Sequence, residues 1–412
     1  MPGHSHSHDH ELDVEPRLAR TLNAIVIVIA VVTVFGAAVL WPSGEAQNDR
    51  QQVRFEYPDA TLTTITPVEC PGLTSATTVT CRLLEAKLTS GSRSGETVLV
   101  YIQETDPVAA LLAAGDGVVL TYNAAALEDF RFQFVDYQRG SSLWILVILF
   151  VIVVVALSRW HGVRALAALA ISLFVLMAGV LPSLLRGNDA VQVALVGAAL
   201  VGFVALYLTN GINMASTVAL LGTFAALIVT ATLAWIFTDL AKLTGLTDDA
   251  QQTLRFTASG VNLRDLIIAG SVIGALGVLD DVTVTQVSAV TELRRANPSL
   301  NRRELYGAAL RIGRDHVAST INTLVLAYAG ASLPLLLIYV QADTPLGRVL
   351  GTEVVATEII RTLVGTIGLV ISVPITTALA AAVIAPRMIR QHDPEPDDTP
   401  PSPRWEDFAP EG

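Results

Sequence analysis

The chain has 412 residues, of which 52% are hydrophobic and only 15% are charged. This composition is typical of a polytopic membrane protein and excludes an ordinary soluble enzyme. The formal net charge of -11 argues against nucleic acid as a partner, so the lipid bilayer is the first partner that we expect.

The first 21 residues form a polar tail that we expect in the cytoplasm. Histidines recur in it at alternate positions, namely His4, His6, His8 and His10. Imidazoles in such a tail chelate transition ions such as zinc or nickel, and the alternative is a plain polar extension. This weak metal site is the only cofactor site that the sequence indicates.

Residues 22–41 contain an apolar run, Leu22 to Leu40, that is long enough to span a membrane. Arg17 and Arg20 precede the run, and it is longer than the apolar part of a usual signal peptide. We therefore interpret it as an uncleaved first transmembrane helix, with the following residues outside the cell.

Residues 42–140 are predicted to be an extracytoplasmic β-rich domain. Four segments alternate apolar and polar residues with a period of two, and Gly, Asp or Pro lies between them. These segments are 77–88, 96–104, 116–123 and 129–137. The pattern predicts a small antiparallel barrel or sandwich, and we expect an OB-like barrel.

Cys70 and Cys81 are the two cysteines of the chain, and both lie in this region. An extracytoplasmic location favours a disulfide between them, and two free thiols are the alternative. The region shows no Ser/His/Asp or Cys/His set, so we expect a structural cap or a module that binds an envelope protein.

Residues 141–386 are predicted to contain seven further spans, which makes eight with the first. Their apolar runs are Leu143–Leu157, Val163–Leu181, Ala190–Leu208, Met214–Phe237, Leu266–Val290, Val317–Val340 and Ile359–Ala385. The fold class is therefore a mainly α, polytopic transmembrane helix bundle with a small β domain. Arginines concentrate in alternate loops, which places both termini in the cytoplasm by the positive-inside rule. The acidic, Pro-rich tail at 387–412 is expected to be disordered.

The run beginning at Leu266 carries the adjacent acids Asp280 and Asp281. Helical spacing places Asp281 on one face with Thr285 and with three glycines, Gly270, Gly274 and Gly277. Glycines let a second helix approach closely, and an aspartate facing lipid costs roughly 2.5–3.5 kcal/mol. We therefore expect this face to point into protein or into a watery cavity, with Asp281 central and Asp280 to one side.

The next span presents a second polar face. Arg314 and Asp315 lie at its cytoplasmic mouth, and Asn322 and Thr323 lie one to two turns further in. Together with Asp281 and Thr285 they form a candidate site for a proton, a cation or a small solute. The alternatives are an acid that only supports helix packing and an interfacial Arg314–Asp315 ion pair.

Three stretches of the sequence resemble the YibE/F-like family of bacterial integral membrane proteins. They are AGSVIGALGVLDDVTVTQ at 269–286, IGRDHVASTINTLVLAYAGASLPLLL at 312–337 and FVDYQRGSSL at 134–143. The resemblance implies a multi-pass protein of the bacterial plasma membrane with an extracytoplasmic β-rich region. It implies no particular activity.

Two functions follow as hypotheses. The first is a secondary transporter or permease of a small solute or ion that uses an intramembrane carboxylate. The second is a non-transporting scaffold or sensor that binds an envelope partner through its outer domain. We expect no enzymatic activity, because Asp281 and Asp315 lack the setting of an aspartic protease. The sequence predicts neither the solute nor the oligomeric state.

Overall fold

The computed structural model describes residues 16–42, 56–71, 80–247, 249–258, 260–342 and 345–384. The histidine tail with its candidate metal ligands and the acidic tail at 387–412 lie outside these residues. The chain divides into two compact units, Gln47–Val163 and the remainder, formed by Met1–Ala46 and Arg164–Gly412.

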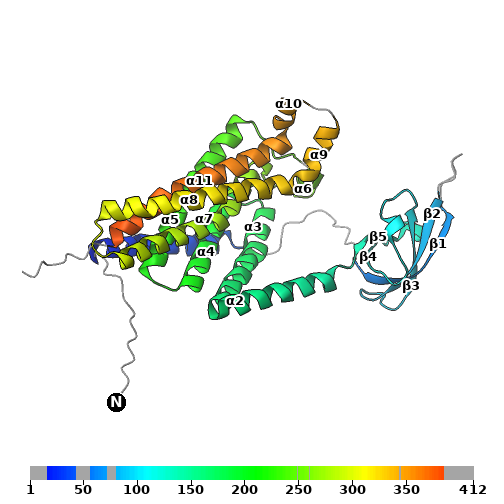
Figure 1. Cartoon of the computed structure of the whole chain (residues 1–412). Helices are drawn as coiled ribbons and strands as arrows, with labels where there is room; N and C mark the ends of the chain where they lie inside the picture. The colour runs from blue at the N-terminus through cyan, green and yellow to red at the C-terminus, as the bar shows by residue number, and fades with distance from the viewer. Residues whose placement is uncertain are drawn as a thin grey trace, which may run out of the picture. The chain divides into compact units, whose positions relative to one another are not determined.

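The first unit holds a five-stranded antiparallel sheet in the order β3-β2-β1-β4-β5 (Figure 1). Its strands are β1 (Asp59–Glu69), β2 (Thr80–Leu88), β3 (Thr97–Gln103), β4 (Gly117–Tyr122) and β5 (Phe132–Tyr137), with short 3₁₀ turns η1 (Ala109–Leu111) and η2 (Glu128–Phe130). The predicted alternating segments coincide with β2 to β5. β1 is an additional central strand, and its alternation is regular only in its first half.

The alternation of apolar and polar residues along the strands determines the core of this sheet. Leu62, Leu84, Val100, Val118 and Leu120 are each at most 1% exposed, and they come from β1, β2, β3 and β4. Because side chains of a strand point to opposite faces in turn, one face of each strand supplies this core. β3 and β5 are edge strands that are not hydrogen-bonded to each other in the sheet. The predicted closed barrel is therefore not observed.

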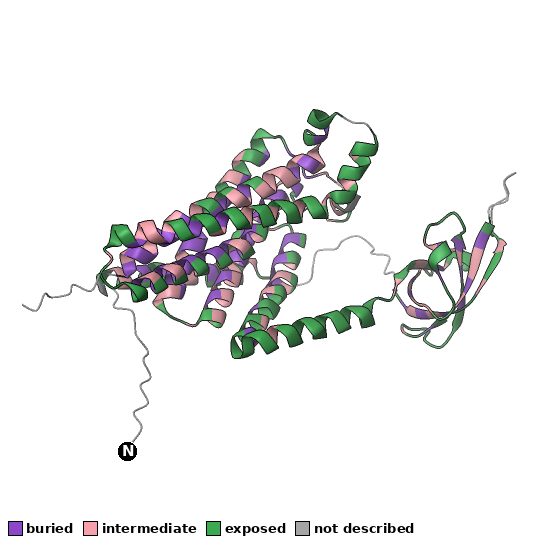
Figure 2. Cartoon of the chain, in the orientation of Figure 1, coloured by how far each residue is buried: buried purple, intermediate pink, exposed green. Residues whose placement is uncertain are grey.

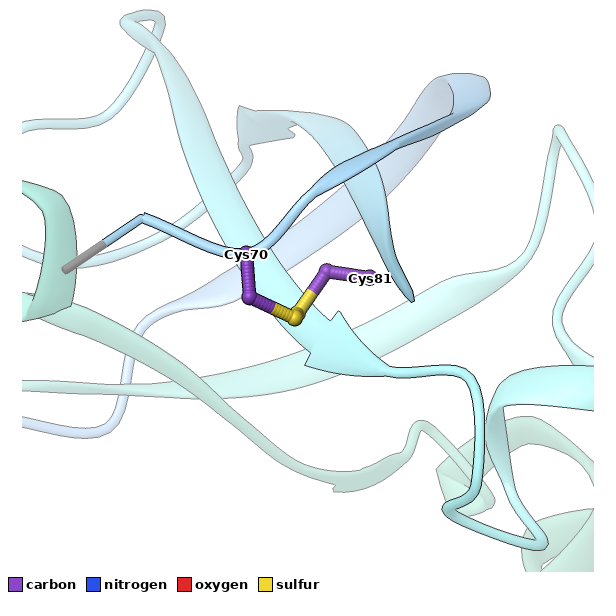
Figure 3. Close-up of a disulfide and its surroundings, with 2 residues drawn as sticks. All are labelled: Cys70 and Cys81. Atoms are coloured by element: carbon purple, nitrogen blue, oxygen red, sulfur yellow. A yellow bond between two sulfur atoms is a disulfide. The ribbon is translucent and has the colours of Figure 1, made fainter. Parts of the chain in front are cut away.

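A disulfide joins Cys70, just after β1, to Cys81 in β2 (Figure 3). The antiparallel register pairs Val68 with Cys81, which brings the end of β1 beside the start of β2. The two Cα atoms are 5.0 Å apart, within the usual range for a disulfide.

α2 (Gly140–Phe174) leaves helical geometry at Arg159, where φ is 49° and ψ is -125°. With the π-helical turn η3 (Val175–Val180) and α3 (Leu181–Leu185), it forms a run of 46 residues. At 1.5 Å per residue the run would measure about 69 Å, more than twice the roughly 30 Å of a bilayer core. The break at Arg159 lies between the two spans that we expected here.

The second unit is helical. Besides η3 and α3 it contains α1 (Pro16–Leu40), α4 (Ala190–Asn210), α5 (Met214–Leu240), α6 (Asp249–Thr257), α7 (Leu263–Ala296), α8 (Arg302–Ala331), α9 (Leu333–Gln341), α10 (Leu346–Leu350) and α11 (Glu353–Val383). α5, α7 and α11 pack against one another in its centre, and purple buried positions concentrate there in Figure 2. Leu220, Leu279 and Leu369, one from each helix, are at most 1% exposed.

Six described helices are long and apolar enough to cross a membrane, or seven if the bent pair α8 and α9 counts as one span. The axes of this pair differ by 62°. Eight spans follow only if the 46-residue run is divided at Arg159, so the expected count is not established. Between α5 and α7 the structure forms the short α6.

Candidate functional site

Asp280 and Asp281 lie in the middle of α7, and the structure orients them differently from the expectation. Asp280 is half-buried, with its Oδ1 atom buried, whereas Asp281 is exposed. The reason is the identity of the larger side chains. Leu276, Leu279 and Val282 are buried in the core, and burying each such side chain is worth about 1.5–3 kcal/mol, whereas a glycine contributes almost nothing. These residues turn the face with Asp281 outward.

The Asp280 carboxyl lines a cavity of about 430 Å³. The second half of α2 and η3 form one side of the cavity, and α4 and α7 form the other. Seven of its seventeen lining residues are Ala or Gly, which leave the room that larger side chains would fill. The volume lies within the range of small-molecule sites in proteins.

Asp280 Oδ1 is buried and has no hydrogen-bond partner among the described residues. Asp280 is also the only titratable side chain among the residues that line the cavity. Buried polar atoms normally have partners, and each exception requires an explanation. The π-helical turn is a second unusual feature, because such turns occur often at functional sites, and its Leu176 and Val180 line the same cavity.

A separate polar pocket of about 190 Å³ lies next to the α4–α5 turn. Asn210, Asn213 and Ser216 line it from one side, and Ser288 of α7 lines it from the other. Thr209 lines the Asp280 cavity, so adjacent residues of α4 belong to the two hollows. Asp280 is eight residues from Ser288, which is about 12 Å along the helix axis.

The other members of the predicted constellation do not gather around Asp280. They are all exposed, namely Thr285, Arg314, Asp315, Asn322 and Thr323. The hydroxyl of Thr323 donates to the carbonyl of Ser319, one turn earlier in α8, at 3.1 Å. Together with Asp281, these residues give α7 and α8 a polar outer surface.

The three predicted packing glycines do not mediate close helix contacts. A Cβ atom at Gly277 would meet nothing within 4 Å, and at Gly270 and Gly274 its nearest neighbours would lie at ordinary distances of 3.6 and 3.5 Å, to Arg361 Nη2 and Tyr328 OH. This expectation is corrected, because a Cβ atom has room at each of the three positions.

Close helix contacts depend instead on Gly222, Gly313 and Gly368. A Cβ atom at Gly313 would lie 2.6 Å from both Gln286 Oε1 and Val373 Cγ1, and one at Gly222 or Gly368 would collide with a threonine hydroxyl of the facing helix. Helical spacing alone does not single out these three glycines, because which glycine faces another helix is decided by tertiary packing.

The sequence reading also missed a buried network of polar side chains between the central helices. The hydroxyls of Thr223 and Thr283 are 2.7 Å apart. Gln286 Nε2 donates to the carbonyl of Ala309 at 2.9 Å and to the hydroxyl of Thr377 at 2.7 Å. The signal that was available is the recurrence of threonine and glutamine within apolar runs.

Among the described residues, no group of three or more His, Cys, Asp or Glu side chains is placed to hold a metal ion. Asp280 and Asp281 are therefore not part of a larger acidic cluster there. The cavity instead combines an apolar wall with one carboxyl group.

A family model described as YibE/F-like protein matches residues 146–386, which include every residue that lines the cavity. Neither a curated protein nor a solved structure matches the chain.

Proposed function

We propose that this chain, which belongs to the YibE/F-like family, is a multi-pass membrane transporter that uses the Asp280 carboxyl to bind a cation or a proton. The observation that carries the proposal is the buried, unpartnered Oδ1 of Asp280 on the wall of a 430 Å³ cavity. Ionisable residues inside membrane helices are costly and mark ion or substrate pathways by default. An acid that served only packing would have an ion-pair or hydrogen-bond partner.

The position of the acid supports a route to one side of the membrane. Thr209 lines the Asp280 cavity, and the next residue, Asn210, lines the polar pocket at the α4–α5 turn. Irregular backbone is tolerated at membrane depth where it lines a cavity. In our proposal, solute enters or leaves at this turn, and Asp280 holds the charge that is exchanged.

We further propose that the α4–α5 turn faces the cytoplasm of a bacterial cell and that the sheet lies outside the plasma membrane. Arginine-rich loops alternate with loops poor in basic residues, which supports this orientation and cytoplasmic termini. The Cys70–Cys81 disulfide supports it independently, because disulfides persist in oxidising compartments.

A second candidate function is a scaffold or sensor, and the edges of the sheet favour it. β3 and β5 are edge strands, and an extended segment of an envelope protein can add to such an edge by main-chain hydrogen bonds. In that case the bundle would carry no flux, and the outer domain would hold the function.

Flux through the purified full-length chain in liposomes tests the proposal. The vesicles contain a pH-sensitive dye and receive imposed gradients of protons, Na⁺, K⁺ or a small alkylammonium ion. We expect at least one gradient to drive flux above protein-free vesicles, and Asp280→Asn to lower that flux at least tenfold.

Asp281→Asn is the matched control, because it removes the same charge one residue away on the exposed side of α7. Its flux should stay within about threefold of the unmodified chain. If no gradient drives flux, or if both variants carry flux equally well, the transport proposal is wrong. Absence of flux combined with specific capture of an envelope segment by the sheet would support the scaffold.

A further inference from the structure

The side chains on the cavity wall limit the ligand to fewer chemical classes than the proposed function does. Apart from Asp280, the only side chains on the wall with a polar atom are Ser172 and Thr209. The hydroxyl of Ser172 already donates to the carbonyl of Ala168 at 2.8 Å. The remaining wall is built from Ala, Gly, Val, Leu and Ile.

Such a wall is poorly suited to a bare inorganic cation. Calcium and magnesium require about six oxygen ligands, and zinc prefers several nitrogen or sulfur ligands. This wall offers one carboxyl group and two hydroxyls. An anion is disfavoured as well, because the wall has no basic side chain and would bring two negative charges together in a medium of low dielectric.

A cation with an apolar body matches both parts of the wall. Its charged nitrogen would lie beside Asp280 Oδ1, which has no other partner among the described residues. Its hydrocarbon would replace water against the aliphatic side chains, at about 25 cal/mol for each Å² of apolar surface removed from water. The two contributions come from different atoms of the ligand, so they can be measured separately.

We infer that the Asp280 cavity binds an organic ammonium ion with a compact apolar body, of a size that fits within about 430 Å³. This inference rests on the proposed function for its biological role, because it names the substrate class of the same site. As a statement about binding, it is tested without any measurement of flux.

A substitution of Gly277 offers a way to fill the cavity. Gly277 lines it, and a Cβ atom there would meet nothing within 4 Å. A larger side chain at 277 therefore begins in open space on the cavity wall, and we expect it to occupy the cavity. Gly330 of α8 also has nothing within 4 Å of its Cβ position and does not line the cavity, so the same substitution there is a matched control.

The experiment compares three rigid probes of nearly equal shape on the full-length protein in lipid nanodiscs by titration calorimetry. They are 1-aminoadamantane, which is cationic at neutral pH, 1-adamantanol, which is neutral, and 1-adamantanecarboxylate, which is anionic. We expect the amine to bind at least tenfold more tightly than the alcohol, and we expect no measurable binding of the carboxylate.

The variants test separately the contribution of the Asp280 charge and the contribution of the apolar cavity wall to binding. Asp280→Asn should weaken binding of the amine at least tenfold and leave the alcohol unchanged, whereas Asp281→Asn should change neither. Gly277→Phe should abolish binding of both the amine and the alcohol, and Gly330→Phe should preserve both.

Equal affinity for the amine and the alcohol, or an Asp280→Asn variant that binds the amine normally, would overturn the inference. Failure of the inference and failure of the proposed function give different results. Proton or Na⁺ flux that depends on Asp280 without amine binding removes the ligand class and leaves transport standing. Amine binding that depends on Asp280 without any flux leaves the ligand site and removes transport.

Discussion

Two faces of α7 place polar groups inside the helical unit, and they differ in how those groups are satisfied. On one face, Gln286 is 3% exposed and makes hydrogen bonds to Ala309 of α8 and Thr377 of α11. On the other, Asp280 Oδ1 is buried on a cavity wall without a partner among the described residues. The first arrangement holds helices together, and the second leaves a charged group available to a ligand.

The comparison also shows why polarity alone does not identify a functional residue. The Gln286 amide on the packed face is required for stability, because an unsatisfied buried group costs about 1–3 kcal/mol. Removing the Asp280 charge takes away no protein partner, so we expect the fold to tolerate it. The two faces should therefore respond in opposite ways to substitution.

The largest expected effect is at a close contact between α11 and α5. Gly368→Leu places a side chain against Thr230 of α5, and overpacking of this kind costs about 3 kcal/mol. Gly277→Leu is the control on the cavity side, where a Cβ has open space. Thermal unfolding in detergent, followed by tryptophan fluorescence, should show a large loss of Tm for Gly368→Leu alone. Equal losses would mean that the two faces are packed alike.

A smaller loss is expected when one polar group on the packed face is removed. Gln286→Leu leaves the carbonyl of Ala309 without this donor and removes the hydrogen bond to Thr377, which should cost about 1–2 kcal/mol. Asp280→Asn should lower the unfolding midpoint little or even raise it. The same unfolding measurement on both variants sharpens the comparison, and a more damaging Asp280→Asn would contradict it.

The smallest effect is expected for a polar pair outside the membrane spans. The side chain of Arg139 donates to Asp136 at 2.5 Å, and this hydrogen bond, with one from the backbone N–H of Tyr137, lowers the Asp136 pKa below its ordinary value of 3.8. The pair is exposed, so its contribution to stability is small.

Because the folded pKa is the lower one, any stabilisation from this pair is fully present well above the ordinary pKa of 3.8 and is lost as the pH falls through the folded pKa. The protein should show no change from this group between pH 7 and pH 5. An NMR titration of the Asp136 carboxyl should give a midpoint below 3.8, and Arg139→Gln should move it upward. An unchanged midpoint in that variant would show that the arginine is not the main cause.

The sequence predicts much of the architecture, because local patterns determine it. Period-two alternation predicts β2 to β5, and long apolar runs predict where the long helices α1, α2, α4, α5, α7, α8 and α11 lie. β1 was not predicted, because only its first half alternates. The predicted closed barrel was wrong, because closure depends on whether β3 and β5 pair, which local patterns do not show.

The site was predicted less well, for a physical reason. Helical spacing shows that Gly277 and Asp281 share a face, but it does not show which face of α7 meets its neighbours. Leu276, Leu279 and Val282 decide that question, since burying them outweighs burying glycines. The pair of acids was therefore found from the sequence, whereas the selection of Asp281 over Asp280 reversed once the neighbouring helices were placed.

Pro374 lies inside α11, which packs on α5, α7 and α8. Proline lacks a backbone N–H, so the carbonyl one turn before it loses its usual helical donor, and the ring disfavours straight geometry at that point. Bending α11 there breaks one hydrogen bond fewer than bending it elsewhere. α11, which contacts every other central helix, therefore bends most easily at Pro374, where its two halves can tilt relative to each other.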